Sequence, residues 1–243
     1  MMDRYHGASL VGVVAAMVVG AGGIFGAWSS TESLPIVALG IATLLLLVVN
    51  SLLIARWVYH ASSAAWHRRI AWLCFLSLVL CVCGDIVNFN FPETYYRYGE
   101  VVKHDYLADS VFFFGPGYTL LLAAVLMAVW ASGRFRIAAV ALMVVASFVI
   151  SGLSFSSLYI PGTGAYVALM TGGYSFLITS VGISSVLLIR AYGGFRASAG
   201  LWAVGFGLIL AAIADAVIGA FWIYGNDGEG YFPLARDLNW MLY

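Results

Sequence analysis

Charged residues are scarce in this chain of 243 residues, making up 9% of it, whereas 63% of its residues are hydrophobic. Soluble domains carry about a quarter charged residues, so an ordinary soluble domain is excluded. Apolar runs of about 20 residues, long enough to cross a bilayer as helices, recur along the whole length. The sequence therefore predicts an all-α protein, a polytopic transmembrane helical bundle that forms a single membrane domain over residues 1–243.

Lysine is almost absent, since Lys103 is the only one and lies outside the helices that we predict. This excludes a retinal Schiff base of the rhodopsin kind. With no basic cluster outside short loops, nothing in the sequence indicates a nucleic-acid partner. The three cysteines share one apolar run, which favours packing roles over a disulfide or a metal site.

Several catalytic motifs are also missing. The sequence contains no Gly-x-Ser-x-Gly turn, no Gly-rich phosphate loop and no His-Glu-x-x-His helix. These absences argue against serine-nucleophile and classical zinc chemistry. We therefore predict neither a cofactor nor a metal site.

What the sequence does contain is a series of apolar segments separated by Gly, Pro and charged residues. They predict seven full helices and a partial eighth, at residues 8–27, 34–58, 69–91, 107–131, 135–155, 165–191, 199–224 and from about 234 to 243. Eight of the eleven basic residues precede the first helix or flank the loops that follow the even-numbered ones: Arg4, Arg56, Arg68, Arg69, Arg134, Arg136, Arg190 and Arg196. By the positive-inside rule, the N-terminus and these loops are expected to lie in the cytoplasm.

Two pairs of aspartates indicate an internal repeat. Asp85 and Asp215 are 130 residues apart, and Asp109 and Asp237 are 128 apart. Each half would hold four helices, an even number, so both halves would enter the membrane with the same polarity. This predicts a parallel 4+4 internal duplication of residues 1–131 and 132–243. The counterpart of the fourth helix would run to about residue 259, so the last helix is expected to be incomplete, either short or cut from a longer chain.

Two of these aspartates lie within apolar runs. Asp85 follows Gly84 near the end of the third predicted helix, and Asp215 lies in the seventh. A carboxylate at bilayer depth costs about 3 kcal/mol or more unless it is paired, neutralised or hydrated, so each is a functional-site candidate. Asp109 and Asp237 begin the next helices on the same, outer side. We expect the four carboxyl groups to converge between the third, fourth, seventh and eighth helices, where they cannot all be ionised together.

Polar neighbours complete a candidate ligand site. Its members are Asp85, Asn88, Asp109, Tyr118, Asp215, Arg236, Asp237 and Asn239. Structural roles are the alternatives: Asp109 and Asp237 as helix caps, and Asp85 and Asp215 as partners of Arg236 or of Asn and Tyr donors. Gly115-Pro116-Gly117 is expected to interrupt the fourth helix beside this site.

The segments Gly84-Asp85, Leu107-Ala108-Asp109 and Asp237-Leu238-Asn239-Trp240 resemble the multi-helix N-terminal membrane domains of some bacterial diguanylate cyclases and histidine kinases. This resemblance implies a sensory role in the bacterial cytoplasmic membrane. It also implies an effector domain on the cytoplasmic side of the last helix.

A second resemblance is to the bacterial lysoplasmalogenase-like family of eight-helix membrane proteins, which also have a Gly-Asp in the third helix and an aspartate in the seventh. Gly84-Asp85 and Asp215 match these positions, whereas the histidine of the family's fourth helix has no counterpart, the nearest residue being Pro116. The resemblance implies cleavage of a lysolipid vinyl ether by paired carboxyl groups. Such cleavage needs an acid to protonate carbon and a base to activate water.

Three functions fit an acidic pocket that opens to the non-cytoplasmic side. A ligand-binding or sensory membrane module needs only such a pocket. The alternative is a lysoplasmalogenase-like hydrolase in which Asp85 and Asp215 are catalytic, and a proton-coupled carrier is a further alternative. The expected partners are membrane lipid, a small-molecule or lysolipid ligand, and a cytoplasmic effector domain or a second copy of the chain.

Overall fold

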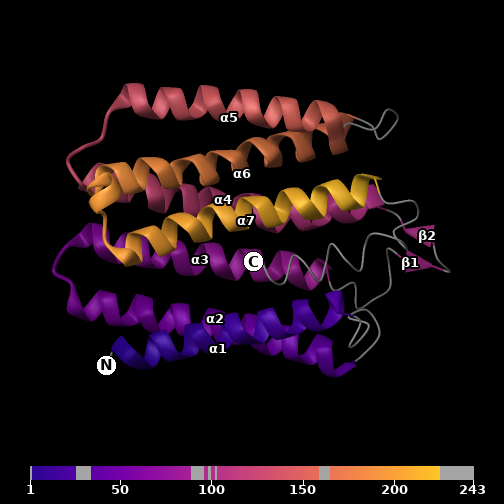
Figure 1. The fold of residues 1–243 in the computed structure, drawn as a ribbon, viewed down its shortest axis with the longest axis horizontal. Coiled ribbons are helices and arrows are strands. Elements are labelled where there is room, and N and C mark those ends of the chain that lie inside the picture. The colour runs from indigo at the N-terminus through magenta and orange to yellow at the C-terminus, as the bar shows by residue number, and fades with distance from the viewer. Residues whose placement is uncertain are drawn as a thin grey trace.

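The computed structural model describes residues 2–25, 34–88, 96–97, 100–101, 103–158 and 165–224, and these are almost entirely helical (Figure 1). The long helices are α1 (Met2–Ile24), α2 (Leu34–Ala61), α3 (Ala65–Asn88), α4 (Lys103–Ala131), α5 (Ile137–Leu158), α6 (Ala165–Ala191) and α7 (Ala199–Tyr224). A short 3-10 helix, η1 (Gly194–Arg196), precedes α7, and strands β1 (Tyr96–Arg97) and β2 (Glu100–Val101) form a small antiparallel hairpin between α3 and α4. The seven full helices predicted from the sequence are confirmed, whereas the eighth falls outside the described residues.

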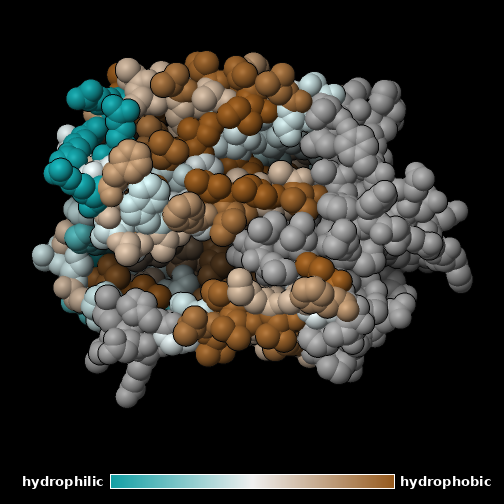
Figure 2. Space-filling view, viewed as in Figure 1, coloured by the Kyte–Doolittle hydropathy of each residue, from teal (hydrophilic) through white to brown (hydrophobic). Residues whose placement is uncertain are grey.

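Six of these helices, α2 to α7, are long and apolar enough to cross a membrane, while the apolar part of α1 covers Gly7–Gly22. Large aliphatic and aromatic side chains are exposed around the bundle, as expected where the surrounding solvent is hydrocarbon rather than water. Figure 2 shows this hydrophobic surface as brown areas along the helices. The chain is therefore a multi-pass integral membrane protein.

Within the described residues, the helices pack mainly on their neighbours in the chain, with two exceptions. α3 lies between α2 and α4, α1 packs on α2, and α6 contacts α5 and α7. The larger exception is α4, which packs on α6 and so joins the first helices to the last, and the smaller is a weak contact of α5 with α7. Figure 1 shows the consequence, with α5 along one edge of the bundle and α1 and α2 along the other.

Small side chains allow α6 to pack closely against the helices that surround it. Ser180, Ser184 and Ser185 are almost completely buried, and their hydroxyl groups donate to carbonyl oxygens of α6 itself at 2.8, 2.7 and 2.6 Å. Because these bonds satisfy the hydroxyl groups, small polar side chains can face apolar partners. On α7, a Cβ atom at Gly205 would lie 2.6 Å from Cδ1 of Ile189, so the Ile189 side chain of α6 rests directly on the α7 backbone.

The expected interruption at Gly115-Pro116-Gly117 is wrong, because α4 continues as one helix through Pro116. Proline removes one N–H donor, and the rest of the helical hydrogen bonds remain available on both sides. The role of Gly117 is close packing: a Cβ atom there would lie 2.9 Å from Sγ of Cys81 and 3.1 Å from the carbonyl oxygen of Ser77, both on α3.

Alternation of helix direction places the α2–α3, α4–α5 and α6–α7 connections at one end of the bundle. The arginines that flank these connections make this end basic, and Figure 2 shows hydrophilic residues in teal gathered there. The basic end is thus a feature of the fold, while its cytoplasmic location stays a prediction. The 4+4 duplication also stays a prediction, since part of its second half lies beyond the described residues.

Replacement of Gly117 by alanine is expected to destabilise the protein, because the backbone carbonyl of Ser77 cannot move away without separating α3 from α4. Overpacking of this kind costs about 1–3 kcal/mol. The matched control is Gly115→Ala on the same helix, where a Cβ atom meets nothing within 4 Å. Thermal unfolding in detergent should give a lower Tm for Gly117→Ala and an unchanged or higher Tm for Gly115→Ala. Equal Tm values for the two variants would contradict the close α3–α4 contact.

Candidate functional site

The two intramembrane aspartates come together in the structure. Asp85 lies in the last turn of α3, and Asp215 lies nine residues before the end of α7. Their carboxyl groups are close enough to interact electrostatically. Each residue is partly exposed as a whole, but its Oδ2 atom is fully buried and has no hydrogen-bond partner in the described part of the chain. The structure therefore brings Asp85 and Asp215 together, while their role as a functional site stays a prediction.

Two tyrosines face the same carboxyl group. The phenol hydroxyls of Tyr118 on α4 and Tyr174 on α6 both interact with Asp215 as donors. Their rings meet edge to face, with centroids 6.1 Å apart. The buried hydroxyl of Tyr174 nevertheless has no hydrogen-bond partner among the described residues, so its approach to Asp215 stops short of a full bond. We call Asp85, Tyr118, Tyr174 and Asp215 the acid–tyrosine cluster.

Close helix contacts hold this cluster in place. At Gly84, a Cβ atom would lie 2.7 Å from Cε2 of Phe114, so the α3 backbone rests directly on that ring. Phe114 in turn packs near Tyr174, with ring centroids 6.3 Å apart. Phe114 and Tyr118 also belong to the buried core that extends toward the basic end. Gly84, the residue before Asp85, thus sets how closely this part of α3 approaches the Phe114 and Tyr174 rings.

The cluster combines acceptors and donors in apolar surroundings. Two carboxyl groups supply acceptor oxygens, and two phenol hydroxyls supply both donors and acceptors. Burying such groups without partners costs free energy, about 1–3 kcal/mol for each unsatisfied group. The arrangement is therefore chemically suited to accept hydrogen bonds from a cation or a hydroxyl group, or to exchange protons.

Tyr174 is the member of the cluster that sequence reasoning missed. It lies in the interior of an apolar helix, directly after Gly172-Gly173. A phenol at membrane depth beside two glycines was a usable signal, because tyrosines that only anchor a helix lie at the membrane interface. Its partner on α7 is 41 residues away in the sequence, and no local pattern reveals that contact.

The other predicted site residues have different outcomes. Asp109 is exposed and is not part of the buried cluster. Its interpretation as a helix cap is wrong, because α4 already begins six residues earlier, at Lys103. Asn88 is the last residue of α3, and its side chain is not among those described. Arg236, Asp237 and Asn239 lie outside the described residues.

Comparison of the chain with protein-family models, with curated proteins and with solved structures gives no match. The site is therefore interpreted from its own geometry.

Removal of the Tyr174 hydroxyl is expected to cost little, because that group has no full hydrogen bond to lose. Tyr174→Phe should leave the Tm unchanged or raise it slightly. The control is Tyr192→Phe, which removes a 3.0 Å hydrogen bond from the Tyr192 hydroxyl to the Ala128 carbonyl oxygen and should lower stability by about 1 kcal/mol. If thermal unfolding shows the two variants to be equally destabilised, the Tyr174 hydroxyl is not an unsatisfied group.

Proposed function

We propose that this protein is a membrane ligand-binding module in which the acid–tyrosine cluster receives a cationic or hydroxyl-bearing ligand. The observation that carries the proposal is that three buried oxygens, on Asp85, Tyr174 and Asp215, have no hydrogen-bond partner among the described residues. Native proteins leave few buried polar groups unsatisfied, and ionisable residues within the membrane mark ligand or proton pathways. A ligand that donates hydrogen bonds would satisfy all three oxygens at once.

The position of the cluster supports a sensory role. Within the described residues, α3 packs on α2 and α4, whereas α7 packs on α6 and more weakly on α5. A ligand held between Asp85 and Asp215 would thus link two helices that otherwise have no extensive contact. Such a ligand shifts the protein toward the arrangement in which both helices contact it. A cytoplasmic effector domain or a second copy of the chain would detect that change.

The proposed orientation places the N-terminus and the basic end in the cytoplasm of a bacterium, with the cluster nearer the opposite surface. It rests on the positive-inside rule and on the arginines gathered at one end of the bundle. The meeting of Asp85 with Asp215 supports the proposed duplication as well. In a parallel repeat these are equivalent residues on the equivalent helices α3 and α7.

Lysolipid hydrolysis is a second candidate because two carboxyl groups and two phenols lie together. One carboxylic acid would protonate the vinyl-ether carbon, and the neighbouring carboxylate would stabilise the oxocarbenium ion that results. Water would then add to that ion while the carboxylate accepts its proton, giving a hemiacetal that breaks down to a long-chain aldehyde and a water-soluble glycerophosphodiester. Acid and base catalysis of this kind contributes about 10²–10⁴-fold to a rate.

The proposed topology can be tested by cysteine labelling in a background without the three native cysteines. Phe195 at the basic end is 96% exposed, so Phe195→Cys is a suitable reporter. Ala165→Cys, at the exposed first residue of α6, reports on the other end. In intact cells, a membrane-impermeant thiol reagent should label position 165 and should reach position 195 only after lysis. The reverse pattern would contradict a cytoplasmic N-terminus.

The proposed ligand site can be tested with purified protein and a panel of small amines, polyols and alkenyl lysophospholipids. A ligand that raises the Tm of the wild type should bind at least about tenfold more weakly to Asp85→Asn and Asp215→Asn, since each loses a charged acceptor. Asp109→Asn, which changes an exposed carboxylate, is the matched control and should bind normally.

Each result of this test has a defined meaning. Binding that survives both substitutions would refute a site at the cluster. Release of an aldehyde from an alkenyl lysophospholipid, lost in both variants, would identify the protein as a hydrolase. Stabilisation without product release would support a binding module.

A further inference from the structure

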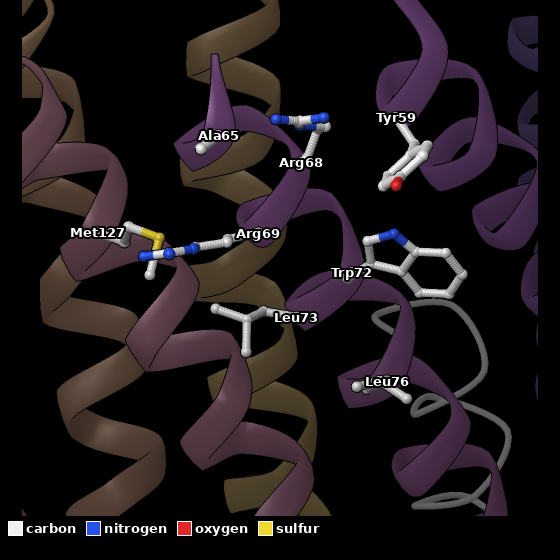
Figure 3. Close-up of a pocket in the computed structure, with 8 residues that line it drawn as sticks. All are labelled: Tyr59, Ala65, Arg68, Arg69, Trp72, Leu73, Leu76 and Met127. Atoms are coloured by element: carbon white, nitrogen blue, oxygen red, sulfur yellow. The ribbon is translucent and has the colours of Figure 1, made fainter. Parts of the chain in front are cut away.

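A groove lies between α2, α3 and α4 at the basic end, away from the acid–tyrosine cluster. Its volume is about 610 Å³, and its lining includes Tyr59 of α2 and Met127 of α4 (Figure 3). A second hollow of about 290 Å³ adjoins it, sharing Tyr59 and Trp72 and adding Arg56 and His60. The described lining of both hollows contains basic, aromatic and aliphatic residues and no acidic one.

One face of α3 supplies most of the lining. Its residues follow one another at helical spacing of three and four: Ala65, Arg68, Arg69, Trp72, Leu73 and Leu76. Such spacing places side chains along a single stripe of a helix. From the basic end inward, the stripe therefore changes from guanidinium groups to an indole ring and then to aliphatic side chains. This order is complementary to a phospholipid, whose phosphate would meet the guanidinium groups, whose glycerol region would meet the indole ring, and whose acyl chain would meet the aliphatic side chains.

The two arginines are placed to meet an anion. The guanidinium carbon of Arg68 lies 5.4 Å from the centroid of the Tyr59 ring, a cation–π contact that joins α3 to α2. Figure 3 shows Arg69 extending from α3 toward Met127 of α4, whereas Arg68 lies on the side of Tyr59, so the two arginines flank the groove near the start of α3. Both occur at the start of α3, where the positive end of the helix dipole disfavours cations. An anion bound there would offset that repulsion.

We propose that this groove binds an anionic phospholipid, with its phosphate held by Arg68 and Arg69 and an acyl chain along Trp72, Leu73 and Leu76. Arginine pairs with phosphate oxygens through two parallel hydrogen bonds, which gives both strength and orientation. Basic pockets between membrane helices bind anionic headgroups on the cytoplasmic side, where such lipids are abundant. This site is independent of the acid–tyrosine cluster and its ligand.

An interfacial belt of arginine and tryptophan would also put basic and aromatic residues at this depth. The chain offers a matched pair of variants that separates the two explanations. Arg68→Gln/Arg69→Gln removes two positive charges from the groove. Arg134→Gln/Arg136→Gln removes two exposed charges from the α4–α5 connection at the same end of the bundle, outside the lining of the groove.

The experiment measures the Tm of the full chain in detergent micelles that contain increasing amounts of phosphatidylglycerol or of phosphatidylcholine with the same acyl chains. Phosphatidylglycerol should raise the wild-type Tm, and phosphatidylcholine should have a much smaller effect. The groove variant should need at least about tenfold more phosphatidylglycerol for the same shift, while the α4–α5 variant should behave as the wild type does. If the Tm shift caused by phosphatidylglycerol is weakened equally in both variants, the effect is one of general charge and the proposal is overturned.

A second measurement does not depend on the stability of the arginine variants. Phosphatidylglycerol with brominated acyl chains should quench the fluorescence of Trp72, seen as the difference between wild type and Trp72→Phe. Quenching that is the same in both proteins would overturn the proposed path of the acyl chain. A Tm increase with inorganic phosphate as large as that with phosphatidylglycerol would identify free phosphate, not lipid, as the ligand.

Discussion

Hydrocarbon cannot hydrogen-bond, and this constraint determines how every polar residue in the bundle is accommodated. The common solution is local. Buried hydroxyl groups on α6 and elsewhere donate to carbonyl oxygens of their own helix three or four residues earlier, as Ser184 and Thr43 do. A rarer solution joins two helices: the Asn50 amide of α2 donates to the Ser9 hydroxyl of α1 at 2.8 Å. In the described part of the chain, the unsatisfied oxygens of the acid–tyrosine cluster are exceptions to this pattern, together with the Ser147 hydroxyl of α5. The cluster differs from Ser147 because it gathers three such oxygens in one place.

The close packing of the helices and the positions of the polar groups in the site depend on each other in this fold. Without a hydrophobic effect between helices in lipid, association relies on close van der Waals contact, which small residues permit. Gly84 lets α3 rest on Phe114, and Gly117 lets α4 rest on α3. The same two contacts bring Asp85 and Tyr118 toward each other. The glycines that bring these helices together therefore also bring together the chemical groups of the site.

The sequence allowed much of the fold to be predicted, because apolar length is a direct consequence of bilayer thickness. The bounds of α6 and α7 were predicted correctly. The start of α4 was not, because its first residues, Lys103–Tyr106, are polar enough to resemble a loop while still forming helix. For the same reason, Asp109 was wrongly interpreted as a cap. Pro116 was expected to break α4, but one lost donor is not sufficient to end a helix that its neighbours support.

The candidate site was predicted in part, through the aspartates Asp85 and Asp215 and through Tyr118. The 130-residue spacing of Asp85 and Asp215 indicated that they are equivalent, and the structure brings them together. Tyr174 has no such signal, because its proximity to Asp215 arises from the packing of α6 on α7. The groove at the basic end was also missed, since its residues come from three helices and each alone resembles an ordinary interfacial residue.

The depth of the acid–tyrosine cluster has an electrical consequence. Asp85 lies three residues from the end of α3, about 4.5 Å along the helix axis, and Asp215 lies nine residues from the end of α7, about 13.5 Å. A cation that enters from the nearer surface therefore crosses only part of the transmembrane field. Moving one elementary charge through the whole field is worth about 2.3 kcal/mol per 100 mV. Occupancy of the cluster by such a cation would thus vary less with membrane voltage than occupancy of a site reached across the full bilayer.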